Sequence, residues 1–219
     1  GVAAIVGSAL FNIMVIPAVS GLTSREQLRT NRDLVYKEAQ FYMIAVAVLT
    51  LTFSFAAIYN PLSGSEEGIR GEMTRWLALM PIALYALYLF VQYQDTIDHT
   101  GKVDTTGIKP GKEWAKLALS LVIIVVGVEG LVQAAIHFGD IFGTPSFLWG
   151  ITVVAAGTSI PDAFVSIRAA RQGRGVTSIA NVLGSNTFDL LVCIPVGVLI
   201  AGTAAINFSV AAPMLAVLT

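Results

Sequence analysis

Six apolar runs, each about as long as a membrane-crossing helix, dominate this sequence of 219 residues. A helix needs about 20 apolar residues to cross the hydrocarbon core of a bilayer. The runs are residues 3–22, 39–59, 76–93, 117–136, 147–167 and 176–202, and a shorter one, 206–219, reaches the end of the sequence. Charged residues make up 12% of the chain, about half the fraction typical of a soluble domain. We therefore predict an all-α fold, a polytopic bundle of transmembrane helices in an integral membrane protein, with the lipid bilayer as partner.

Charge and cysteine content exclude several classes of function. The net charge is -1, and binding to nucleic acid needs concentrated Lys and Arg, so no nucleic acid partner is expected. The single cysteine, Cys193, can form neither an internal disulfide nor a thiol-rich metal site.

The loops predict how the chain is oriented in the membrane. If successive runs alternate in direction, the loops after the first, third and fifth runs lie on one side. That side holds 11 of the 13 basic residues: Arg25, Arg29, Arg32, Lys37, Lys102, Lys109, Lys112, Lys116, Arg168, Arg171 and Arg174. The positive-inside rule places these basic loops in the cytoplasm, and we expect the cell membrane as the location.

The charged residues inside the apolar runs are all acidic: Glu129, Asp162 and Asp189. Intramembrane acids are energetically costly and usually functional, so this pattern indicates a site for something positively charged. Glu129 lies toward the outer end of its run without hydroxyl neighbours, and we interpret it as an interfacial or vestibule carboxylate rather than a primary ligand.

Part of the first run recurs in the sixth. Gly-Ser-Ala-Leu-Phe-Asn at 7–12 corresponds to Gly-Ser-Asn-Thr-Phe-Asp at 184–189. The two copies are predicted to run in opposite directions, and such inverted repeats are typical of secondary transporters. In each copy a Ser precedes an amide or carboxylate by four residues, which places both oxygens on one helix face.

The fifth run contains a predicted break at residues 155–162. Pro161 removes a backbone donor and disfavours helix in the residue before it, so we expect carbonyls around 156–158 to lose their helical partners. Thr158, Ser159 and Asp162 stand beside these carbonyls. With Ser185, Asn186 and Asp189 they form an all-oxygen donor set, which suits hard cations such as calcium or sodium.

These motifs resemble a known family. Gly-Thr-Ser-Ile-Pro-Asp at 157–162, followed by the motif at 184–189, resembles the second α-repeat of the calcium/cation antiporters, which include the sodium/calcium exchangers. The motif at 7–12 resembles the later half of their first α-repeat. The resemblance implies a transporter rather than an enzyme, with calcium and sodium as transported ions and no cofactor. Asp189 is similar to the potassium-dependent branch, which leaves potassium open as a third ion.

The resemblance also implies a ligand set. Asp162 and Asp189 would be central cation ligands, Ser8 and Asn12 would be ligands from the first repeat, and Asn186 would brace the shell. The remaining oxygens would come from Thr158, Ser159 and Ser185.

The resemblance divides the chain as follows: 1–22, the later half of the first α-repeat; 23–94, a basic cytoplasmic loop and two transmembrane helices; 95–116, a short cytoplasmic linker; 117–202, the second half with its α-repeat at 143–202; 203–219, a truncated transmembrane helix. We expect an excerpt of a longer protein, truncated at both ends. Its partners would be the missing helices of the parent chain. One of them would carry a further Thr-Ser-x-Pro-acid motif, starting about 20 positions before Gly1 by the logic of the repeat.

Charge accounting suggests the mechanism. Calcium or several sodium ions would neutralise the carboxylates, whereas an empty site leaves anions in a low-dielectric interior at a cost of several kcal/mol each. We therefore expect calcium and sodium to be exchanged by alternating access at a site near the membrane midplane. Three alternatives remain: a calcium/proton exchanger, an intramembrane aspartyl protease with two acids that share a proton, and a membrane scaffold without transport activity.

Overall fold

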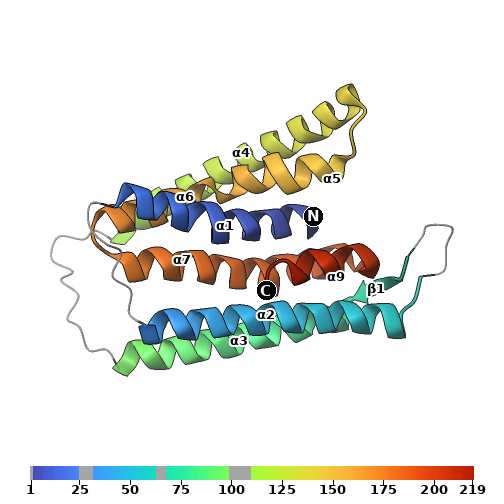
Figure 1. Cartoon of the computed structure of the whole chain (residues 1–219), viewed down its shortest axis with the longest axis horizontal. Coiled ribbons are helices and arrows are strands. Elements are labelled where there is room, and N and C mark those ends of the chain that lie inside the picture. The colour runs from blue at the N-terminus through green and yellow to red at the C-terminus, as the bar shows by residue number, and fades with distance from the viewer. Residues whose placement is uncertain (1, 25–31, 63–67, 99–109) are drawn as a thin grey trace.

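The computed structural model describes residues 2–24, 32–62, 68–98 and 110–219. Within these ranges, six helical stretches are long and apolar enough to cross a membrane. They are α1 (Val2–Thr23), α2 (Arg32–Tyr59), α3 (Arg75–Asp98), α4 (Pro110–Phe142), η1 with α6 (Gly150–Val154 and Ala155–Arg171), and α7 with η2 and α8 (Gly175–Phe188, Asp189–Cys193 and Ile194–Ala201). The long helices lie side by side as a bundle (Figure 1). The predicted fold class is confirmed.

Side-chain contacts give the relative directions of the helices that carry the motifs. Ser8 meets Ser159, and Ser24 meets the carbonyl of Ala170, so α1 and α6 run parallel. Asp162 meets Ser185, and Ser166 meets the carbonyl of Ser178, so α6 and α7 run antiparallel. Helices α1 and α7 therefore run in opposite directions, as the inverted repeat predicts.

Gly7 permits a close crossing between α1 and the η1–α6 segment. A Cβ atom at this position would lie 2.4 Å from the carbonyl oxygen of Ile151 and 2.7 Å from the Cβ of Ala155. Such distances are well below van der Waals contact, so only glycine allows the two backbones to approach this closely. The next residue, Ser8, is thereby brought against α6.

The buried core lies among α1, α2, α3 and the α7–η2–α8 segment. Its largest fully buried side chains include Phe53 and Leu49 of α2 and Leu190 and Leu191 of η2. By contrast, α4 exposes apolar side chains such as Val126, which is 67% exposed. Together with the short helix α5 (Ser146–Trp149), α4 lies at the margin of the bundle (Figure 1). Apolar side chains that are exposed on a membrane helix face lipid or further helices.

A two-stranded antiparallel ribbon joins the two halves of the chain. Strand β1 (Arg70–Thr74) pairs with β2 (Thr203–Asn207), with Arg70 opposite Asn207 and Thr74 opposite Thr203. The loops after the second and sixth helical stretches therefore share one end of the molecule.

The ribbon corrects the prediction that residues 203–219 form one truncated transmembrane helix. Helix α8 ends at Ala201, and the next residue, Gly202, has a φ of 92°, in a region that glycine adopts readily. The next five residues hydrogen-bond to β1, and helix α9 (Phe208–Ala216) begins only after them.

The predicted break around residues 156–158 is wrong, because α6 continues through Pro161 from Ala155 to Arg171, although Pro161 has no N–H to donate to the carbonyl of Gly157. The irregular turn is the π-helical segment η1, which precedes α6. Proline removes only its own N–H donor, and the hydrogen bonds on either side keep the helix intact. A second π-helical turn, η2, begins at Asp189, and such turns occur frequently at functional sites.

Candidate functional site

Two serine hydroxyls form the first contact between the motifs of the two repeats. The Oγ atoms of Ser8 in α1 and Ser159 in α6 are 2.7 Å apart, and both side chains are buried. Because a hydroxyl both donates and accepts, each retains a lone pair for a further partner. The contact lies at the crossing that Gly7 permits.

One helical turn along α1, Asn12 joins all three motif helices. Its Nδ2 donates to Oδ1 of Asn186 in α7 at 2.9 Å and to Oδ2 of Asp162 in α6 at 3.4 Å. Nδ2 of Asn186 in turn donates to the carbonyl of Ala9 at 3.2 Å. These partners fix the orientation of the Asn12 amide, since both groups that face Nδ2 are acceptors.

The Asp162 carboxylate lies where the three helices meet. Its Oδ2 also accepts a hydrogen bond of 2.5 Å from the hydroxyl of Ser185 in α7. The carboxylate is part-buried, whereas Asn12 and Asn186 are fully buried. Six of the predicted site residues therefore form one connected cluster or lie directly beside it: Ser8, Asn12, Ser159, Asp162, Ser185 and Asn186.

The oxygen of the Asn12 side chain has an unsatisfied hydrogen-bonding capacity. Among the residues that the structure describes, nothing donates to its Oδ1, which is buried. A buried acceptor without a partner costs about 1–3 kcal/mol, so such atoms usually mark a place for a ligand, a water or an ion. This oxygen belongs to a side chain that contacts the Asp162 carboxylate.

Two predicted ligands are placed differently. The hydroxyl of Thr158 donates to the carbonyls of Val154 and Ala155 in the preceding turn, at 3.0 and 3.1 Å. Asp189, at the start of η2, accepts a hydrogen bond of 3.5 Å from Sγ of Cys193. It lies four positions after Ser185, the residue whose hydroxyl donates to Asp162.

The donor chemistry of the cluster is oxygen-based. Across the described ranges, no group of three or more His, Cys, Asp or Glu side chains forms a metal-binding arrangement. The available ligands are instead hydroxyl, amide and carboxylate oxygens, which hard cations prefer. Glu129 lies apart on the exposed face of α4 and accepts a hydrogen bond of 2.8 Å from Gln133.

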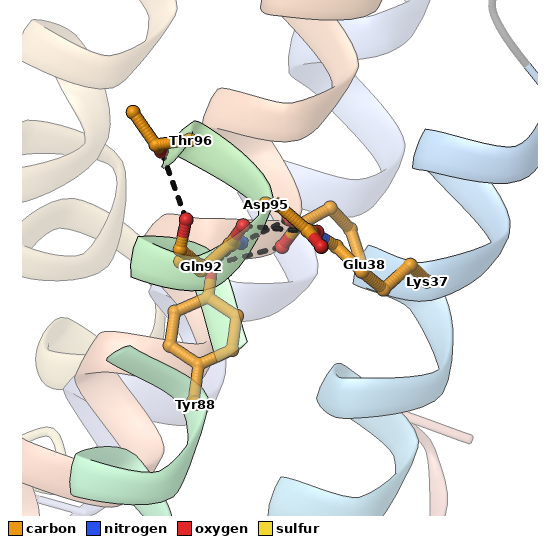
Figure 2. Close-up of polar contacts among 6 residues, drawn as sticks. All are labelled: Lys37, Glu38, Tyr88, Gln92, Asp95 and Thr96. Atoms are coloured by element: carbon orange, nitrogen blue, oxygen red, sulfur yellow. Dashed lines mark hydrogen bonds and ion pairs between the residues drawn. The ribbon is translucent and has the colours of Figure 1, made fainter. Parts of the chain in front are cut away.

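Sequence reasoning missed a polar cluster between α2 and α3 (Figure 2). Glu38 is 4% exposed and accepts hydrogen bonds from the hydroxyl of Tyr88, at 2.8 Å, and from Gln92. Lys37 forms an ion pair with Asp95 and donates to Gln92. The apolar run of this segment begins at residue 39, which left Lys37 and Glu38 outside, whereas the membrane-capable stretch begins at Val35.

It also missed Asn181, which lies one turn before Ser185 in α7. Its Nδ2 donates to the backbone carbonyl of Asp162 at 3.3 Å and to the hydroxyl of Ser166 at 3.0 Å. The four-residue spacing to Ser185 is the only signal in the sequence that pointed to it.

The chain matches the family model described as "Sodium/calcium exchanger protein" over residues 1–94 and 112–219. It is 40% identical over 79 residues to the sodium/calcium exchanger MaX1 of Methanosarcina acetivorans, a match that covers 36% of this chain and 23% of the relative. It is 50% identical over 54 residues to the human sodium/potassium/calcium exchanger 4, covering 25% of this chain and 9% of the relative. A third relative is the putative antiporter CaxA of Alkalimonas amylolytica, 33% identical over 85 residues, covering 39% of this chain and 27% of the relative.

The matched segments thus span between about a tenth and about a quarter of these relatives. No solved structure matches the chain.

Proposed function

The chain belongs to the sodium/calcium exchanger family, and from that premise we propose that it forms part of an antiporter that exchanges calcium for sodium across a membrane. Its six membrane-capable helices and its relatives support an integral membrane protein. The cation binds at the meeting point of α1, α6 and α7. Its ligands are drawn from Asp162, Asp189, Asn12 and the hydroxyls around them.

The observation that carries this proposal is that no donor among the described residues meets Oδ1 of Asn12, a side chain whose Nδ2 contacts the Asp162 carboxylate. A bound water or a protein donor would satisfy the amide oxygen, but neither would compensate the nearby negative charge. A cation does both, because it accepts lone pairs from neutral oxygens and balances the carboxylate. Calcium takes six to eight such oxygens, and sodium uses the same chemistry with less charge.

Charge balance at the site accounts for the coupling of calcium transport to sodium transport. With Asp162 and Asp189 ionised, one calcium ion or two sodium ions neutralise the site. An empty site leaves two carboxylates that repel each other inside the bundle, at a cost of several kcal/mol. The unloaded protein therefore resists the conformational change, and one ion crosses only when another returns. Alternating access proceeds by movement of peripheral helices against the two repeats.

The remaining ligands come from outside this chain. The cluster has one carboxylate, with that of Asp189 outside it, and two of its oxygens, Oδ2 of Asp162 and Oδ1 of Asn186, already accept hydrogen bonds from within it. The relatives are also much longer than the matched segments. We place the missing oxygens on an upstream helix with a Thr-Ser-x-Pro-acid motif that runs antiparallel to α6.

Flux measurements in vesicles test the proposal. The protein encoded by the complete gene is reconstituted, and calcium uptake is followed under an outward sodium gradient, with and without potassium, and under a proton gradient. Sodium-driven uptake that Asp162→Asn abolishes supports the proposal. Asp140→Asn, which changes an exposed acid in α4, serves as the matched control.

Each alternative has its own signature in the same experiment. Uptake driven only by the proton gradient identifies a calcium/proton exchanger. Absence of flux under every gradient overturns the antiporter proposal, and cleavage of an added peptide substrate would then identify a protease. Dependence of sodium-driven uptake on potassium identifies potassium as a third ion.

A further inference from the structure

A chain of three hydrogen bonds links α6 and α7 on the side of Asp162 that is away from Ser159. Nδ2 of Asn181 donates to the backbone carbonyl of Asp162 and to the hydroxyl of Ser166. That hydroxyl donates onward to the backbone carbonyl of Ser178, at 3.2 Å. Ser166 and Ser178 are 0% and 2% exposed, so the bond between them is shielded from water, whereas the two bonds of Asn181 are part-buried. In each of the three bonds the donor is an amide N–H or a hydroxyl, and the acceptor is a carbonyl or hydroxyl oxygen.

Asn181 and Ser185 hold the same residue from one face of α7. They are four positions apart, and such residues are neighbours on a helix surface. Ser185 donates to the carboxylate of Asp162, whereas Asn181 donates to its backbone carbonyl. Helix α7 thus contacts Asp162 at both its side chain and its main chain.

The main-chain contact matters because an aspartate side chain is short. Its carboxylate lies one methylene from the Cα atom, so a displacement of the backbone moves the carboxylate almost equally. The preceding Pro161 has no N–H and leaves the carbonyl of Gly157 without its helical donor. Just after this missing bond, Asn181 holds α6 from outside the helix through the carbonyl of Asp162.

We propose that Asn181 is a positioning residue for the cation site, which acts on the ion through Asp162. The inference rests on the proposed function, since it assigns Asp162 to the ion. Asn181 fixes the backbone of Asp162 relative to α7, and so sets the distance between the Asp162 carboxylate and the ligands on α1 and α7. Ligand groups need support of this kind, because displacements of about half an ångström already weaken a site.

If Asn181 served only to pack α6 against α7, its removal would have a different effect on calcium affinity. The variant Ser166→Ala distinguishes this packing role from the positioning role. Ser166→Ala removes the hydroxyl that links Asn181 to Ser178 but leaves the bond from Asn181 to Asp162. Asn181→Ala removes both bonds of the Asn181 amide. If the hydrogen bonds serve only to hold α6 against α7, the two variants lower stability to a similar degree and leave calcium affinity alone.

The experiment measures sodium-driven calcium uptake as a function of calcium concentration, with the protein from the complete gene in vesicles. We expect Asn181→Ala to raise the KM for calcium about fivefold to tenfold with little change in the maximal rate. This corresponds to the loss of one net hydrogen bond. Ser166→Ala should keep KM within about twofold of wild type. The Tm in detergent without calcium is recorded for each variant.

A KM that Asn181→Ala leaves unchanged overturns the inference, as do equal KM shifts in Asn181→Ala and Ser166→Ala. If Asn181→Ala does not give folded protein, Asn181→Gln decides, because it keeps the amide but displaces it by one methylene. A raised KM at unchanged Tm then supports the positioning role, and an unchanged KM overturns it. Absence of wild-type flux refutes the proposed function instead, which distinguishes the two failures.

Discussion

Asn12 in α1 and Asp162 in α6 are 150 positions apart in the sequence, yet the Asn12 amide donates directly to the Asp162 carboxylate. The contact joins the partial first repeat to the second. It leaves Oδ1 of Asn12 as a buried acceptor that nothing in the described part of the chain satisfies. A cation at this point would complete the hydrogen-bonding and charge balance of both side chains.

Removal of the Asn12 amide tests this relationship. In the reconstituted protein, Asn12→Ala should raise the KM for calcium about tenfold, because an oxygen ligand is lost and Asp162 loses a donor. Thr52→Ala is the matched control. Its side chain is buried, and its hydroxyl donates to the carbonyl of Val48 in its own helix. Equal KM values in the Asn12 variant and wild type would show that Asn12 is not a ligand of the ion.

The crossing at Gly7 predicts a stability effect. Gly7→Ala would place a Cβ atom 2.4 Å from a backbone oxygen of η1, and the helices must then separate, at a cost of about 1–3 kcal/mol. Gly197→Ala is the control, because nothing lies within 4 Å of the added Cβ. This variant should be neutral or stabilise α8 by about 0.5–1 kcal/mol. Thermal unfolding in detergent gives both values. A Gly7→Ala protein as stable as wild type would refute the close crossing.

The polar cluster of Glu38 predicts a second stability effect. Tyr88→Phe removes the hydroxyl that donates to the buried Glu38 carboxylate, and it should destabilise the protein by about 1–3 kcal/mol. Tyr36→Phe alters a tyrosine of α2 that is 63% exposed, and it should have little effect. Comparison of the two melting temperatures checks the prediction. Similar melting temperatures would show that the cluster contributes little.

The ribbon gives a geometric prediction. In a Cys193→Ser background, Glu72→Cys and Ala205→Cys place two thiols at opposed positions of β1 and β2, and we expect a disulfide under mild oxidation. The shifted pair Glu72→Cys and Ala204→Cys should cross-link much more weakly, because adjacent strand residues point to opposite faces. Cross-linking is measured by mass spectrometry after proteolysis. Preference for the shifted pair would contradict the register.

Orientation in the membrane is tested with the same background. A thiol at Ile69, 60% exposed at the ribbon end, should react with an impermeant maleimide added outside intact cells. A thiol at Lys116, near the start of α4, should react only after permeabilisation, since the basic loops are predicted to be cytoplasmic. The reverse pattern of labelling would invert the proposed topology.

The sequence predicted the membrane-spanning stretches and most of the clustered residues for a simple reason. Length and hydropathy determine which stretches cross a bilayer, and four-residue spacing places Ser8 with Asn12 on one face. Partners across helices, such as Asn12 with Asn186, depend on crossing angles and on the close approach at Gly7, which no spacing rule gives.

Three local features were not predicted, the first two because a competing interaction prevailed. Thr158 turns its hydroxyl to carbonyls of its own helix, which is a frequent choice for threonine in helices. Residues 203–207 form a strand because β1 supplies hydrogen bonds from a distant segment. Asn181 has no counterpart in the first copy of the repeat, where Ala4 stands at the equivalent position, so comparison of the two copies did not reveal it.

Calcium binding by the purified protein from the complete gene tests the central claim most directly. Equilibrium binding of radioactive calcium is measured for wild type, Asp162→Asn and Asp140→Asn, with and without excess sodium. The account predicts calcium binding that sodium displaces, with affinity unchanged in Asp140→Asn and reduced about 100-fold in Asp162→Asn, which corresponds to about 2.7 kcal/mol. Equal calcium affinity in Asp162→Asn and wild type would contradict it.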